Sequence, residues 1–232
     1  LSKANSKWYV SSDAANALAA RVALFQNKMT DAANYAEAVL ANSSFSLAST
    51  AMDFSKNWVA GSSSPEIIFA YVNNSRASSP LNFTLYVNDT DGSWNFADAN
   101  TLSRKGDVRS KATFTSQDAN RVIKYPNGTY QLAETSDYTC TPVVISRISE
   151  MYLVKAEALG KMNGAATLVE YMKKRYTTAP SEAAIKALSD KEYQTLILDE
   201  RRREFYAEGM RWQDIKRTNR LELLETLDGR TY

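Results

Sequence analysis

Acidic and basic side chains alternate over residues 199–217, and no other stretch of the chain offers so many groups that could do chemistry. Glu200, Glu204 and Glu208 recur every four residues, which places three carboxylates on one face of a helix. Two carboxyl groups can act as general acid and base when they face each other across a substrate. These acids are instead interleaved with arginines, which would pair with them and lower their pKa values, whereas a general acid needs a raised pKa. We therefore interpret the stretch as a structural network whose members here are Glu200, Arg201, Glu204, Glu208, Arg211 and Asp214.

Apolar residues within this stretch indicate that it packs against the protein. Phe205, Trp212 and Ile215 occur at helical spacing among the charges and are expected on an inner face. Gly209 is expected to break the stretch into two helical segments joined by the ion pairs.

Other kinds of reactive site are weakly supported. The chain has no histidine, which excludes imidazole bases and ligands, and one cysteine, Cys140, which excludes an internal disulfide. Asp89, Asp91 and Asp98 fall in one loop that could suit Ca²⁺, but the complete calcium-loop spacing is missing and an ordinary polar turn is preferred. We expect no metal and no cofactor.

Composition bounds the class of protein. The 232 residues carry a formal charge of +2 with acids and bases matched locally, so a nucleic-acid partner is not indicated. The apolar runs are too short to span a bilayer. The chain opens at Leu1 without a leader peptide, and we expect a trimmed chain, a mature form or a cytosolic protein, with trimming favoured.

Aromatic residues in polar loops suggest a ligand surface. The loop from Tyr86 to Asn95 combines Tyr86 and Trp94 with Asp91 and Asn95. Flat aromatic faces flanked by hydrogen-bonding groups suit sugar rings, so these four residues are the candidate ligand-binding residues. Buried loop anchors are the alternative interpretation.

The periodicity predicts a mainly α fold of tetratricopeptide-like helical hairpins around a loop-rich middle region with a few short strands. A hairpin is expected over 12–42, its second helix capped by Thr30 or Asp31. Strand-length runs occur at 66–72 and 83–87 within the polar middle, and helices are expected over 143–159, 165–176, from 180 onward and over 190–207. The expected inner residues are Ala15, Leu18, Ala19, Val22 and Phe25, then Ala32, Tyr35, Ala36, Val39 and Leu40, then Ile148, Tyr152, Ala156 and Leu159.

An ordered series of motifs makes the chain recognisable. The tail from Glu200 to Arg217 resembles Glu-Arg-x-x-Glu-Phe followed by Glu-Gly-x-Arg-x-x-Asp-Leu-x-Arg, the C-terminal signature of the SusD/RagB family. The run Arg147–Leu159 is similar to that family's Arg-x-x-Glu-x-Tyr-Leu-x-x-Ala-Glu-Ala helix, which adds Arg147 to the expected network. Asp107, Arg109, Phe114, Lys124 and Tyr125 resemble the landmarks between them.

The resemblance implies a non-catalytic, surface-exposed lipoprotein of the Bacteroidetes outer membrane. Such a protein binds oligosaccharides or polysaccharides and works with a SusC-like TonB-dependent transporter in nutrient uptake. It would meet the membrane only through a lipid anchor that this chain lacks. Residues 1–232 would form a single domain of this type, without the family's leader, first helices and C-terminal tail.

Two other functions stay open at this stage. A tetratricopeptide-type scaffold could present the same loops to another protein. A glycoside hydrolase is disfavoured because no opposed pair of carboxylates can be proposed.

Overall fold

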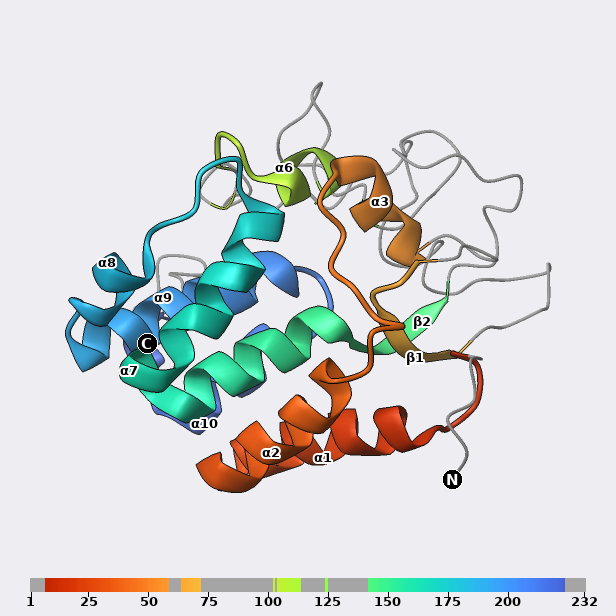
Figure 1. Ribbon diagram of the computed structural model, residues 1–232, viewed down its shortest axis with the longest axis horizontal. Helices are drawn as coiled ribbons and strands as arrows, with labels where there is room; N and C mark the ends of the chain where they lie inside the picture. The colour runs from red at the N-terminus through yellow and green to blue at the C-terminus, as the bar shows by residue number, and fades with distance from the viewer. Residues whose placement is uncertain are drawn as a thin grey trace.

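The structure, a computed structural model, describes residues 7–58, 64–71, 102, 104–113, 124 and 142–223. Helices dominate these residues, and two short strands lie among them (Figure 1). The elements are α1 (Ser12–Phe25), α2 (Met29–Leu40), α3 (Ala51–Ser55), η1 (Lys56–Trp58), β1 (Ile67–Tyr71), α6 (Val108–Thr113), β2 (Val143–Arg147), α7 (Ile148–Arg175), α8 (Glu182–Lys186), α9 (Asp190–Glu204), α10 (Arg211–Thr218) and η2 (Leu221–Leu223). The predicted fold class, mainly α with helical hairpins and short strands, is confirmed.

The predicted hairpin over 12–42 is formed by α1 and α2, but its buried face differs from the prediction. Ser11 caps α1 by accepting a hydrogen bond from the backbone N–H of Ala14. The residues of α1 that face α2 and α7 are mostly small: Ala14, Ala17, Ala20, Ala23 and Leu24. The predicted stripe from Ala15 to Phe25 lies on the other side, where Val22 is 52% exposed. Both sides of α1 are apolar, so spacing alone did not identify the packed one.

The second helix of the hairpin follows the prediction more closely. Ala32, Ala36 and Val39 are buried, as expected, while Tyr35 is 41% exposed. The helix begins at Met29 after Lys28, so the expected cap at Thr30 or Asp31 is wrong.

The stretch predicted as one helix over 143–159 divides into a strand and a helix. Val143, Val144 and Ile145 are β-branched, and they pair with β1 in a two-stranded antiparallel sheet. Helix α7 starts directly afterwards at Ile148. Of the expected inner stripe of this helix, Ile148 and Ala156 are buried, whereas Tyr152 and Leu159 are only partly so.

A sharp turn at Gly160 divides α7 into two segments, within the interval between the helices predicted over 143–159 and 165–176. Gly160 adopts a positive φ of 68°, a conformation that other residues rarely adopt. Gly164 then lets the second segment approach the first, because a Cβ there would lie 2.2 Å from the carbonyl oxygen of Ala156. The two segments form a second helical hairpin (Figure 1).

The C-terminal helices begin at clear capping signals. Ser181 caps α8, and Ser189 with Glu192 forms a capping box at the start of α9. Helix α9 ends at Glu204, and Gly209, with φ of 77°, lies in the connection to α10, so the predicted break near this glycine is confirmed.

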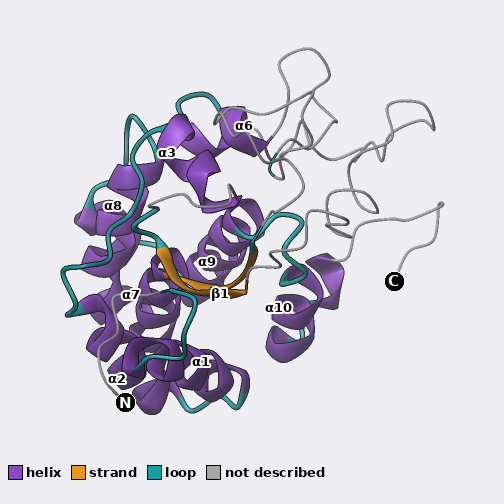
Figure 2. Cartoon of the chain, turned by 90° about the vertical axis from the view of Figure 1, so that its right-hand side faces the viewer, coloured by secondary structure: helices purple, strands orange, loops and turns teal. Residues whose placement is uncertain are grey.

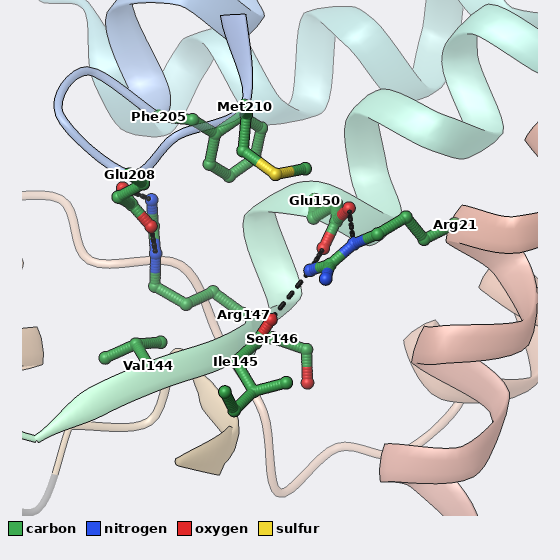
Figure 3. A pocket seen from close by; sticks show the side chains of 9 residues that line it. All are labelled: Arg21, Val144, Ile145, Ser146, Arg147, Glu150, Phe205, Glu208 and Met210. Carbon is green, nitrogen blue, oxygen red and sulfur yellow. Dashed lines mark hydrogen bonds and ion pairs between the residues drawn. The ribbon is translucent and has the colours of Figure 1, made fainter. Parts of the chain in front are cut away.

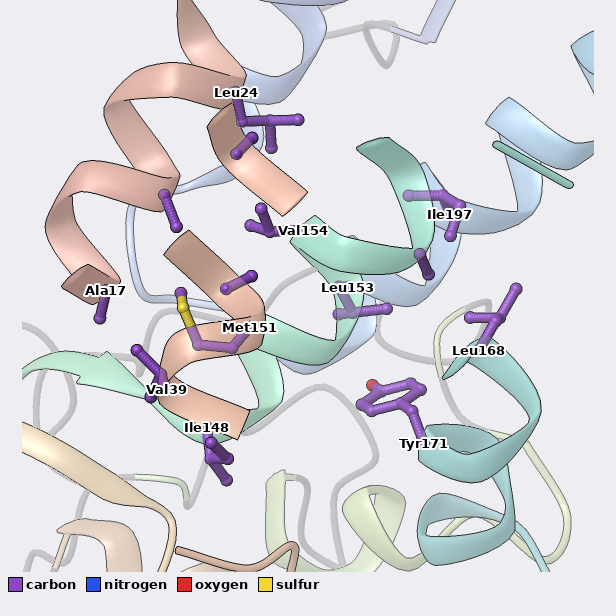
Figure 4. Close-up of a cluster of buried hydrophobic side chains, with 14 of the residues drawn as sticks. Ala17, Leu24, Val39, Ile148, Met151, Leu153, Val154, Leu168, Tyr171 and Ile197 are labelled. Atoms are coloured by element: carbon purple, nitrogen blue, oxygen red, sulfur yellow. The ribbon is translucent and has the colours of Figure 1, made fainter. Parts of the chain in front are cut away.

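The main hydrophobic core lies among α1, α2, α7 and α9. Val39, Met151, Leu168 and Ile197 meet there with exposures of 0% (Figure 4). A smaller cluster around Phe54 and Trp58 lies near the other end of the molecule, where α3 packs on α6 (Figure 2). The sheet lies between these two regions and leads directly into α7.

Among the residues that the structure places, no helix is both long and apolar enough to cross a membrane.

Candidate functional site

Glu204 lies at the centre of a buried cluster of charges. Its carboxylate receives hydrogen bonds from Arg147 Nη1 at 2.6 Å, Arg175 Nη2 at 2.9 Å and Arg109 Nη1 at 3.3 Å. Tyr171 adds its hydroxyl at 2.8 Å. Because Glu204 is the last residue of α9, these bonds join that helix to β2, α6 and the C-terminal end of α7.

Arg109 extends the cluster toward α6. Its guanidinium donates to Asp107 Oδ2 at 2.7 Å, Glu200 Oε2 at 2.9 Å and the Tyr176 hydroxyl at 2.5 Å. The side chain is 2% exposed. These three bonds come from Nη2, while Nε donates to Asp107 Oδ1 at 2.9 Å and Nη1 to the Tyr171 hydroxyl at 2.7 Å. Each nitrogen thus has an acceptor, which is the condition for burying a guanidinium at tolerable cost.

Glu66, just before β1, receives a second set of bonds. Arg147 Nη1 donates to its Oε2 at 3.1 Å and Arg175 Nη2 to its Oε1 at 2.8 Å. The backbone N–H of Ala48 and the Asn57 amide complete its coordination. Glu66 thus brings the sheet and the segment before α3 into the cluster.

Lys124 joins the cluster from the middle of the sequence. Its ammonium donates to the carbonyl oxygens of Glu204 and Tyr206 at 3.0 and 2.9 Å and to Glu208 Oε1 at 2.5 Å. It also lies 4.4 Å from the ring centroid of Trp58. Burial lowers the pKa of Lys124 to about 8, although Glu208 opposes that effect.

A second group of ion pairs joins α7, α9 and α10. Arg201 Nε donates to Asp214 Oδ2 at 2.8 Å, and Arg217 connects Asp214 to Glu157. Arg211 instead donates to the carbonyl oxygens of Leu198 and Leu223. Phe205 and Ile215 are buried beside these pairs as predicted, but Trp212 is 54% exposed and the prediction of an inner position for it is wrong.

The charges set the protonation of the central acids. Burial alone would raise the pKa of Glu204, but the charges of Arg175, Arg147 and Arg109 hold it well below its usual range. The pKa of Asp214 is likewise lowered, because Arg201 and Arg217 outweigh its burial. Both groups are carboxylates at neutral pH and have no proton to give as general acids. Within the described part of the chain, no cluster of acids or cysteine has the geometry of a metal site.

A pocket of about 150 Å³ adjoins the charged cluster. It is bounded by the turn before α10, by β2 and by Arg21 of α1 (Figure 3). Arg21 donates to both carboxylate oxygens of Glu150, at 2.7 and 2.6 Å, and to the carbonyl oxygen of Ile145 at 2.7 Å. Phe205 and Met210 supply an apolar wall opposite Arg21. Arg21, Arg147, Glu150 and Glu208 of this pocket are already paired, whereas the buried Ser146 Oγ has no hydrogen-bond partner, and this geometry alone does not select a ligand.

Residues 50–230 match the family model described as the SusD family. The chain belongs to the SusD family. The buried cluster is therefore part of a SusD-family scaffold, and the resemblance stated from the sequence is confirmed.

Three similar proteins have names that refer to SusD or to carbohydrate binding. It is 31% identical over 100 residues to SusD-like protein P38 of Formosa agariphila, an alignment that covers 39% of this chain and 20% of that protein. A SusD-like carbohydrate binding protein of Bacteroides vulgatus shares the fold with a TM-score of 0.71 at 18% identity, covering 93% of this chain and 47% of that one. Surface glycan-binding protein A of Bacteroides thetaiotaomicron aligns with a TM-score of 0.68 at 18% identity, covering 98% of this chain and 59% of that one. The chain thus spans about half the length of these structures.

The ligand-binding residues proposed from the sequence lie outside the described residues. Tyr86, Asp91, Trp94 and Asn95 all fall within 72–101, for which no structural statement is made, and so does the calcium-type loop. Their assignment stays a prediction.

The network residues, by contrast, are brought together from distant parts of the sequence. Arg147, Glu200, Glu204 and Glu208 meet in one cluster, and Arg201 and Asp214 pair beside α10. The sequence analysis missed Glu66, Arg175, Tyr171 and Tyr176 as members. Asp107, Arg109 and Lys124 were noted only as SusD-family landmarks. For Lys124, its position between Ile123 and Tyr125 was the signal available.

Proposed function

We propose that this chain is part of a non-catalytic protein that binds oligosaccharides or polysaccharides at the cell surface. The observation that carries the proposal is its membership of the SusD family over residues 50–230. The names of two structures with the same fold, a SusD-like carbohydrate binding protein and a surface glycan-binding protein, support it.

The chemistry of the buried cluster supports a role without catalysis. The carboxylates at its centre are paired with arginines and closed off from solvent, with exposures of 0% for Glu66, Glu200 and Glu204. The arginines around Glu204 hold the pKa of that carboxyl well below its usual range. A glycosidase instead needs one protonated and one ionised carboxyl group facing a substrate. In this proposal the cluster holds the helices together and the sugar binds elsewhere.

The sugar would bind to the loop that contains Tyr86, Asp91, Trp94 and Asn95. An indole face stacks on the C–H face of a pyranose ring, while the acid and amide bond its hydroxyls. Trp94→Ala is expected to weaken glycan binding about five- to thirtyfold, since loss of one well-packed aromatic contact costs about 1–2 kcal/mol.

Two controls make this substitution informative. Trp212→Ala removes a tryptophan that is 54% exposed on α10, and it should leave glycan affinity unchanged. Circular dichroism should show full helical content for both variants. If Trp94→Ala loses its helical signal, Trp94 is a core residue; if it stays folded and binds normally, the proposed site is wrong.

The protein would act at the outer membrane with a SusC-like TonB-dependent transporter in nutrient uptake. Attachment would be through a lipid anchor, as the resemblance to the SusD/RagB family implies. Protease treatment of intact cells should cleave the protein at the surface, and affinity purification should recover an outer-membrane β-barrel with it. A protein protected from protease in intact cells, and released only on lysis, would contradict surface exposure.

A further inference from the structure

A small cavity lies between α6 and the C-terminal part of α9. Its volume is about 10 Å³, roughly the sphere of one water molecule. Asp107, Arg109 and Thr113 line it from α6 and the residue before that helix, and Arg203 lines it from α9. All four residues are buried, with exposures between 2% and 7%. The cavity shares no lining residue with the pocket of about 150 Å³ beside β2.

Two polar atoms of the lining residues have no partner among the described residues. Arg203 Nε and Thr113 Oγ1 are both buried and make no hydrogen bond. Arg203 Nη1, by contrast, donates to Glu200 Oε1 at 3.0 Å. Buried polar groups in folded proteins almost always have a hydrogen-bond partner, either in the protein or in an ordered water. Two such atoms at one cavity therefore indicate a ligand that bonds to both.

The charges beside the cavity are balanced, which decides the class of this ligand. Glu200 pairs with Arg203 at 3.0 Å and with Arg109 at 2.9 Å. Arg109 pairs in turn with Asp107 at 2.7 Å. Two guanidinium groups thus alternate with two carboxylates, and an ion beside them would add an uncompensated buried charge. The ligand is therefore neutral, the size of water, and both a hydrogen-bond donor and an acceptor.

We propose that one ordered water molecule is bound in this cavity and joins α6 to α9. Its oxygen accepts a hydrogen bond from Arg203 Nε–H, and the Thr113 hydroxyl makes a second bond with it. The Asp107 carboxylate, which also lines the cavity, accepts one of its protons. Three hydrogen bonds are the usual number for a buried water. The water closes the row of alternating charges that Arg203, Glu200, Arg109 and Asp107 form between the two helices.

Nuclear Overhauser spectra of the ¹⁵N-labelled protein in solution test this proposal. The Nε–H proton of Arg203, assigned by its loss in Arg203→Lys, should show a cross-peak to water. Opposite signs of this cross-peak in laboratory-frame and rotating-frame spectra distinguish a bound water from chemical exchange of the proton. Arg175 Nε, which donates to Glu204 Oε2 at 2.9 Å, is the control and should show no such cross-peak. The absence of a dipolar cross-peak at Arg203 Nε–H would overturn the proposal.

Two substitutions of Thr113 test how the water is held. Thr113→Val keeps the shape of the side chain but removes the hydroxyl, so the cross-peak should disappear and the melting temperature should fall by about 3–8 °C. Thr113→Ser keeps the hydroxyl and should retain the cross-peak, which tests the site even if the valine variant does not fold. A full cross-peak in folded Thr113→Val would contradict the assigned partner. A shift of the Arg203 Nε–H signal when chloride is replaced by bromide would show an anion in place of water. These experiments need no glycan, so their outcome is independent of the proposed sugar binding.

Discussion

The carboxylate of Glu204 forms ion pairs with three buried arginines. Replacing it with glutamine preserves its size but leaves Arg109, Arg147 and Arg175 with too little negative charge around them. Because breaking a buried ion pair from one side costs about 3–5 kcal/mol, Glu204→Gln should lower the free energy of unfolding by at least that amount. Urea denaturation followed by circular dichroism measures it. Glu182→Gln, which alters an exposed pair with Lys186, should change stability by less than about 1 kcal/mol.

The same pairing makes stability depend on acid pH. The pKa values of Glu204 and Asp214 are lowered in the folded protein from ordinary values of 4.5 and 3.8. The unfolded chain therefore binds more protons than the folded chain when the pH falls through that range. The stabilisation is complete above about pH 5 and is lost progressively below pH 4.5. Melting temperatures at fixed ionic strength should fall across this window; a constant value down to pH 3 would contradict the proposed pairing.

At the residue scale, the sequence showed which residues form ion pairs but not which partners they pair with. Regular alternation of Glu and Arg in 199–217 identified a network, because so many charges cannot be buried unpaired. Glu66 could not be assigned to it, since its partners Arg147 and Arg175 lie 81 and 109 positions away. Arg175 also pairs with Glu204, 29 positions away, and no local pattern records such contacts. Trp212 was misplaced because spacing shows which residues share a face but not whether that face is covered.

Gly164 allows the two segments of α7 to pack closely. A methyl group at residue 164 would lie 2.2 Å from the Ala156 carbonyl oxygen and 2.9 Å from the Tyr193 hydroxyl. Gly164→Ala should therefore destabilise the protein by about 2 kcal/mol or more, although alanine favours helices by about 1 kcal/mol. Thermal or urea unfolding measures the change.

A second glycine provides the control for this prediction. At Gly209 no atom lies within 4 Å of an added Cβ, and only the positive φ is strained. Gly209→Ala should cost about 1 kcal/mol. If Gly164→Ala is as stable as the original protein, the second segment of α7 does not approach the first as closely as described.

At the scale of elements, the sequence predicted helices well and the single strand before α7 poorly. The hairpins, the breaks at Gly160 and Gly209 and the start at Ser181 all carry local signals, namely caps, glycines and periodicity. In Val143–Arg147 the β-branched residues favour a strand, but too weakly to separate it from the helix that follows. Pairing with β1, more than 70 positions earlier, decides it.

For the whole molecule, the charged cluster acts as the joint between distant segments. Arg147, Arg175, Arg109 and Lys124 bring together β2, α7, α6 and the middle of the sequence around the end of α9. This arrangement assigns the residues that recur in the SusD-family motifs to the scaffold. Under the proposed function, a ligand would be recognised by the loop that contains Tyr86 and Trp94, outside the described residues.

The most direct test of this division of roles measures two properties of Arg201→Ala. This substitution removes the buried pair with Asp214, so the melting temperature should fall, with a loss of about 3–5 kcal/mol in the free energy of unfolding. Glycan affinity, measured by calorimetry at a temperature where the variant is folded, should stay within about twofold of the original value, less than 0.5 kcal/mol. An unchanged melting temperature together with lost glycan binding would show instead that the Arg/Glu cluster belongs to the binding site.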